Sequence, residues 1–141
     1  MGLDTTHDCW HGSYSGFMVW RLKIAELAGI PLPLMDGFFD WSEHYSPPLD
    51  KIPPHMRRLV PFLPIKWESL RPDPIHFLLD HSDCEGHITW RRAEKIAKRL
   101  EELITGIDKN DPDTGWMYKA TERFIKGAHE AYNAKENVEF H

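Results

Sequence analysis

The sequence predicts an α+β fold that is mostly helical, with three main helices, short terminal strands and a long ordered segment rich in proline and aromatic residues. The first observation behind this prediction is that apolar residues recur at helical spacing in three segments. The second is that residues 137–141 alternate strictly between polar and apolar. With 141 residues, 41% of them hydrophobic, the chain is expected to form one domain over residues 1–141.

Three segments have the pattern of amphipathic helices. The first begins after Ser13, a suitable N-cap, and ends at Gly29. The second spans residues 89–105 and the third residues 116–134, while a short helix is expected at residues 75–80. The residues predicted to face the core are Phe17, Trp20, Ile24 and Leu27 in the first, Ala93, Ile96, Ala97, Leu100, Leu103 and Ile104 in the second, and Met117, Ala120, Phe124, Ala128 and Ala131 in the third.

The two ends of the chain are predicted to be short strands. Residues 2–6 alternate weakly, and residues 137–141 alternate with both apolar side chains expected to be buried. Because an isolated strand is unstable, the two strands are expected to pair, which would place Glu139 and His141 close to Thr5 and His7.

Residues 31–74 contain ten of the eleven prolines, interleaved with aromatic residues. Proline at this density prevents long helices and central strands, and the aromatic content argues against disorder. The segment is therefore predicted to wrap over the core in an ordered way, and a connection of this length is often functional.

Composition excludes several classes of partner. Seventeen basic against 22 acidic residues give a net charge of -5, which argues against nucleic-acid binding. We find no apolar run of about 20 residues and no basic-then-apolar start, so neither a membrane span nor a secretion signal is expected. The protein is accordingly expected in the cytosol of the cell that makes it, with Cys9 and Cys84 as free thiols.

A cluster of titratable residues precedes the first predicted helix. His7 and His11 flank Cys9 and Trp10, and histidine and cysteine are natural zinc ligands. On a strand the two histidines would lie about 13 Å apart, so a shared ion requires a helical turn or a bend, which Gly12 permits. The alternative is that Cys9 and Trp10 belong to the core and the histidines are ordinary polar residues.

A second cluster, residues 80–88, lies between two predicted helices and includes His81, Asp83 and Glu85. It either caps the following helix or carries part of a site. Since both clusters precede helix N-termini, which attract anions, they are expected to face one another across a single polar pocket. The candidate ligands for a divalent metal such as zinc are His7, His11, His81 and Asp83.

The second long helix carries Arg92, Lys95 and Arg99 along one side. An anionic ligand lying across this helix would meet several donors, although a solvated face balanced by glutamates is the alternative. Trp10 and Trp41 lie outside the helical stripes and could stack on a base, unless they belong to the core.

Residues 1–8 (MGLDTTHD), 79–86 (LDHSDCEG) and 136–141 (ENVEFH) together resemble a group of small proteins encoded by tailed phages and prophages. The resemblance covers the whole chain and implies a compact accessory protein acting inside a host cell, without implying an activity. In that group a small residue often stands at the position of Cys9 and an acid at that of His87, so neither is implied as a required ligand.

The sequence therefore predicts a phage-type accessory protein that binds and sequesters an anionic, nucleotide-like host metabolite, using Arg and Lys for phosphate, Trp for the base and His or Asp for the ribose. A metal-dependent hydrolase of such a ligand, with Glu85 or Asp8 as base, and an inhibitor that binds a host protein remain alternatives. The expected ligand-binding residues are His7, Trp10, His11, His81, Asp83, Arg92, Lys95, Arg99 and His141.

Overall fold

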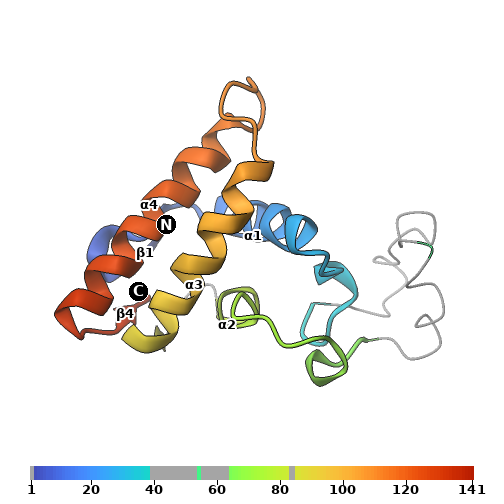
Figure 1. Cartoon of the computed structure of the whole chain (residues 1–141), viewed down its shortest axis with the longest axis horizontal. Coiled ribbons are helices and arrows are strands. Elements are labelled where there is room, and N and C mark those ends of the chain that lie inside the picture. The colour runs from blue at the N-terminus through green and yellow to red at the C-terminus, as the bar shows by residue number, and fades with distance from the viewer. Residues whose placement is uncertain (1, 39–53, 55–63, 83–84) are drawn as a thin grey trace.

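The computed structural model describes residues 2–38, 54, 64–82 and 85–141 and confirms a mostly helical α+β fold (Figure 1). Two long helices, α3 and α4, form an antiparallel pair, and α1 packs against α3 behind it (Figure 1). The helices are α1 (Tyr14–Ala28), α2 (His76–Leu79), α3 (Trp90–Leu103) and α4 (Gly115–Ala134). Among the described residues, no helix is both long and apolar enough to cross a membrane.

Helix α1 begins and ends where its sequence predicts. The Ser13 hydroxyl accepts a hydrogen bond from the Gly16 amide at 2.9 Å, and Gly29 closes the helix in the left-handed region with φ 75°. The predicted apolar stripe needs one correction, because Leu27 is only partly buried whereas Arg21 is 2% exposed. The Arg21 guanidinium lies 4.5 Å from the centre of the Phe17 ring, which explains how a charged side chain can be held there.

Helices α3 and α4 follow their predicted spans closely. The Thr89 hydroxyl caps α3, and the predicted core face is buried up to Leu103. Ile104 is partly exposed, contrary to the prediction, because the chain tightens there into the 3-10 turn Ile104–Gly106 and Ile107 is buried instead. In α4, the predicted Ala120 is also only partly buried.

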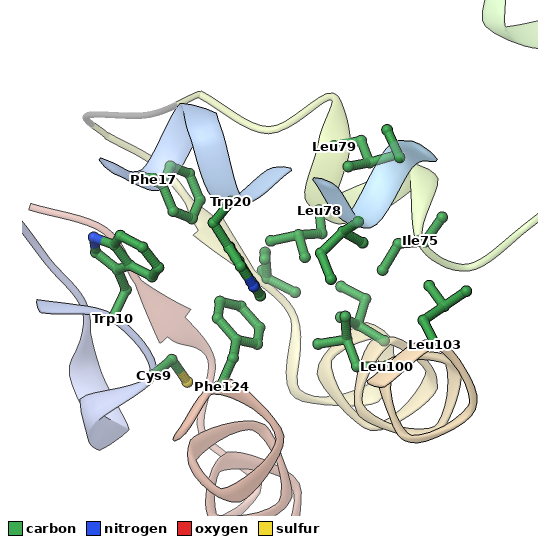
Figure 2. Close-up of a cluster of buried hydrophobic side chains, with 14 of the residues drawn as sticks. Cys9, Trp10, Phe17, Trp20, Ile75, Leu78, Leu79, Leu100, Leu103 and Phe124 are labelled. Carbon is green, nitrogen blue, oxygen red and sulfur yellow. The ribbon is translucent and has the colours of Figure 1, made fainter. Parts of the chain in front are cut away.

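Aromatic side chains fill the core between α1 and α4 (Figure 2). Trp10 stacks on Trp20 with ring centres 5.4 Å apart, and Trp20 lies 5.3 Å from Phe124. The Trp20 indole nitrogen donates to the Thr121 hydroxyl at 2.9 Å. The Trp10 ring, 6% exposed, therefore belongs to the core and is not a free platform for a base. Trp41 lies outside the described residues.

The two chain ends meet, as predicted. Asp4 and His141 exchange backbone hydrogen bonds of 3.0 and 2.9 Å, and a bridge pairs Thr5 with Phe140. Each end has a further partner that its sequence did not predict, because two-residue strands are too short to show alternation. The pairs, both antiparallel, are β1 (Leu3–Asp4) with β2 (His11–Gly12), and β3 (His87–Ile88) with β4 (Val138–Glu139).

Of the proline-rich segment, the structure describes the two ends and Pro54. Met35 and Ile65 form a parallel bridge, and the Trp67 indole donates to the Asp36 carbonyl at 3.0 Å. These contacts bring the two ends of the segment together. The predicted wrap of residues 39–53 and 55–63 over the core lies outside the described residues.

The Cys9 thiol is free and buried, and burial raises its pKa from 9.0 to about 12. The raised pKa means that the stability contributed by the neutral thiol is complete below pH 9.0 and is lost as the pH rises toward about 12. Because alkylation needs the thiolate, we expect iodoacetamide at about pH 8 to modify Cys9 in urea but not in the native protein. Peptide mass spectrometry measures this, and equal rates in both states would contradict the burial. Cys84 lies outside the described residues.

Candidate functional site

A cavity of about 470 Å³ lies between the start of α1 and the first half of α4, and we call it the α1–α4 cavity. Although the chain has a net charge of -5, the described residues that line this cavity include no carboxylate. The cavity therefore favours anions over cations. Its lining residues are Trp10, His11, Gly12, Ser13, Gly16, Trp116, Lys119, Ala120 and Arg123.

One face of α4 supplies the basic wall of the α1–α4 cavity. Trp116, Lys119 and Arg123 are spaced three and four residues apart, so their side chains project from the same side of the helix. The Trp116 indole is 42% exposed and accessible to a ligand. Lys119 has no ion-pair partner within the part of the chain that the structure describes.

The N-terminus of α1 forms the opposite wall. Ser13 satisfies the Gly16 amide, whereas the amides of Tyr14 and Ser15 belong to the first helical turn and have no carbonyl within the helix to donate to. A Cβ on Gly16 would lie 2.9 Å from the Ser13 hydroxyl oxygen, so the glycine keeps this end of the helix open. The helix dipole adds a partial positive charge of about half an elementary charge here.

The indole nitrogen of Trp10 is an unsatisfied donor on the same cavity. Its Nε1 is buried and has no hydrogen-bond partner among the described residues, whereas Trp20 and Trp67 both donate to oxygens. Figure 2 shows this nitrogen on the side of the ring that points away from Phe124. A Cβ on Gly12 would lie 3.6 Å from Nε1, so the missing side chain leaves space beside the donor. An unsatisfied buried donor costs about 1 to 3 kcal/mol, which an acceptor atom of a ligand would recover.

Arg123 also lines a second cavity, of about 540 Å³, above the turn that contains His7 and Asp8. The Arg123 guanidinium pairs with the Asp8 carboxylate, and its Nε donates to the Asp8 carbonyl at 3.0 Å. His7 and Asp8 both have left-handed backbone angles, with φ 58° and 57°. Asp8, Glu122 and Glu130 line this second cavity, which makes it a poorer place for an anion than the α1–α4 cavity.

Lys95 and Arg99 of the predicted basic face line a third cavity, of about 720 Å³, beside the end of α1. Arg99 is already paired, since its Nε donates to both Asp73 carboxylate oxygens, at 3.2 and 3.0 Å, and its Nη1 donates to Glu102 at 2.7 Å. The third predicted residue, Arg92, lies 4.3 Å from the centre of the Phe77 ring. Of the three predicted basic residues, Lys95 and Arg99 thus line the third cavity, and Arg92 lies against an aromatic ring instead.

His76 also lines the third cavity. Burial lowers the pKa of His76, while nearby Asp73 and Asp80 partly oppose this effect. Its Nε2 atom is buried and has no partner among the described residues. The neutral ring can therefore donate or accept a hydrogen bond. The described lining of this cavity is also net basic, with Arg71, Lys95, Lys98 and Arg99 against Asp73 and Glu102, but unlike that of the α1–α4 cavity it contains carboxylates.

The His81 ring packs on the core and away from the other predicted ligands. Its centre lies 4.1 Å from that of Phe140, and its Nδ1 and Nε2 lie 2.7 and 3.0 Å from the carbonyl oxygens of Ser82 and His87. The ring thereby ties together the loop in which it lies. His141 is exposed and is held through its backbone by Asp4.

The two predicted clusters lie along opposite edges of the C-terminal strand. The His141 amide donates to Asp4 on one edge, and the amide of the preceding residue, Phe140, donates to Gly86 on the other. His7 and His11 line separate cavities against α4, and His11 pairs with the Asp4 carboxylate. In the described part of the chain, no three His, Cys, Asp or Glu side chains are placed to hold a metal ion. Asp83, the fourth predicted ligand, lies outside that part.

No protein-family model, curated protein or solved structure matches this chain. The fold and the α1–α4 cavity define a mostly helical α+β protein with a cavity suited to an anion. Sequence reasoning found Trp10 and His11 in this cavity but missed Trp116, Lys119 and Arg123. Helical spacing puts these three on one face of α4, and that signal was available in the sequence.

Proposed function

We propose that this chain is a small accessory protein, of the kind encoded by tailed phages, that binds and sequesters an anionic, nucleotide-like metabolite of the host in the α1–α4 cavity. The observation that carries the proposal is the buried, unsatisfied Nε1 donor of Trp10 on a cavity with basic residues and no described carboxylate in its lining. A ligand oxygen that accepts from Trp10 would remove the cost of the unsatisfied donor.

The donors of the cavity suit an oxyanion. The start of α1, through Ser13 and Gly16, and the Trp10 indole form one wall, where the positive end of the helix dipole lies, and Lys119 is on the other wall. Trp116 offers a partly exposed ring beside Lys119 for the planar part of the ligand. His11, held by Asp4, lines the same cavity and can bond a ligand hydroxyl.

We expect Lys119→Ala to weaken the binding of nucleotides by about tenfold, because it removes a charge-assisted hydrogen bond and the one basic side chain of the cavity that has no acidic partner among the described residues. The measurement is isothermal titration of the full chain with a panel of nucleotides. The matched control is Lys126→Ala, because Lys126 is an exposed lysine of the same helix that lines the second cavity instead.

Sequestration also requires that the ligand be recovered unchanged after incubation, which phosphorus NMR tests. Equal affinities of Lys119→Ala, Lys126→Ala and the unchanged chain would contradict the proposed cavity. The absence of binding for every nucleotide in the panel would contradict the proposed function itself.

A further inference from the structure

Resting on this proposed function, we infer that the ligand of the α1–α4 cavity is an aromatic phosphomonoester, such as a nucleoside monophosphate, and not a di- or triphosphate. The inference follows from how much positive charge in the cavity is still uncompensated. The chemical class of the ligand is inferred from the charge of the cavity, from its hydrogen-bond donors and from the position of the exposed Trp116 ring.

Two of the three titratable side chains that line the cavity already have acidic partners. The Arg123 guanidinium is paired with Asp8, and the His11 ring is paired with Asp4. Lys119 has no such partner among the described residues, so it contributes a full positive charge. Together with about half a charge from the start of α1, the positive charge of the cavity without an acidic partner is at most about +1.5.

This charge can neutralise at most one phosphomonoester. A phosphate monoester carries about -1.5 to -2 at neutral pH and presents three acceptor oxygens. The donors that belong to lining residues and have no partner among the described residues are the Trp10 nitrogen and the Lys119 ammonium, and the start of α1 lies beside them at Ser13 and Gly16. Because Trp10 is only 6% exposed and its nitrogen is buried, this donor selects a compact group that reaches into the cavity.

The described lining of the cavity has no further unpaired positive charge to neutralise a second or third phosphoryl group. Each adds at least one negative charge, and the remaining basic side chains of the cavity, Arg123 and His11, bring Asp8 and Asp4 with them. A di- or triphosphate would therefore place unpaired charge beside carboxylates, which is unfavourable.

The exposed ring of Trp116 explains why an aromatic group should be attached to the phosphate. Trp116 is 42% exposed and lies on the same face of α4 as Lys119, one turn before it. Stacking of a base on an aromatic side chain adds affinity without selecting a particular base. We therefore expect a preference for the phosphomonoester that extends over several bases.

The experiment compares four probes by titration calorimetry on the full chain: a nucleoside monophosphate, the matching triphosphate, the unphosphorylated nucleoside and inorganic phosphate. We expect the monophosphate to bind at least tenfold more tightly than each of the others. Trp116→Ala should weaken monophosphate binding about tenfold and leave inorganic phosphate unchanged, whereas Lys119→Ala should weaken both. The control for Trp116→Ala is Phe77→Ala, at an exposed aromatic residue outside this cavity.

The outcomes separate this inference from the proposed function. A triphosphate that binds as tightly as the monophosphate overturns the inference and leaves anion binding in the cavity intact. Loss of inorganic phosphate binding in Trp116→Ala overturns the role of the ring as a stacking platform. Failure of all phosphorylated probes to bind overturns the proposed function together with the inference.

Discussion

Deleting residues 137–141 is expected to lower the free energy of unfolding by about 5 kcal/mol, which is of the same order as the total stability of a small domain. Val138 is fully buried and Phe140 is 5% exposed, and burying two such side chains contributes about 1.5 to 3 kcal/mol each. The deletion also removes the backbone pairing of His141 with Asp4 and the hydrogen bond from the Phe140 amide to Gly86.

Urea denaturation followed by tryptophan fluorescence measures this loss. The control is Glu139→Ala within the same segment, because the Glu139 side chain is exposed and its backbone hydrogen bond to the Thr6 hydroxyl is retained. We expect this variant to stay within about 0.5 kcal/mol of the unchanged chain. An unchanged melting temperature after the deletion would refute the pairing of the two chain ends.

Gly127→Ala is expected to destabilise the protein by about 2 to 3 kcal/mol, although alanine is the better helix former by about 1 kcal/mol. Gly127 lies where the N-terminal turn packs closely on α4. A Cβ at this position would lie 2.6 Å from the Cys9 sulfur and 2.6 Å from the His7 carbonyl oxygen. The carbonyl belongs to the backbone of a turn with left-handed residues, so it cannot move without disturbing that turn.

Thermal unfolding should show this as a fall in melting temperature of roughly 6 °C or more. Lys126→Ala, at the adjacent exposed position of the same helix, should leave the melting temperature nearly unchanged. If Gly127→Ala instead raised the melting temperature, helix propensity would outweigh the contact, and the close packing of the turn on α4 would be wrong.

The helices could be predicted from the sequence because their signals are local. The Ser13 cap, the stop at Gly29 and the 3.6-residue spacing of apolar residues act over a few neighbouring residues, and the helices begin and end within a residue or two of the predicted positions. The pairing of the chain ends could also be predicted, because Val138 and Phe140 needed a buried face and a strand needs a partner.

The two clusters of titratable residues, at residues 7–11 and 80–88, were less informative about the candidate site. His7, His11 and His81 could each bind a metal ion or a ligand, but the first two face different cavities and the third packs on Phe140. A titratable side chain that is near another in sequence need not point the same way. On the left-handed turn at His7, for example, the backbone angles turn successive side chains in directions that composition does not reveal.

The sequence by itself thus determined the fold class, the extent of the long helices and the burial of the C-terminal residues, since each follows from short-range spacing and the need to bury apolar surface. Only the tertiary structure decided where an anion could bind. The Trp10 nitrogen, the start of α1 and Lys119 meet because α4 packs against the N-terminal segment, with Gly127 allowing the close approach. Contacts between residues so distant in sequence depend on how whole helices pack, and that packing is set by the complete core and not by any local pattern.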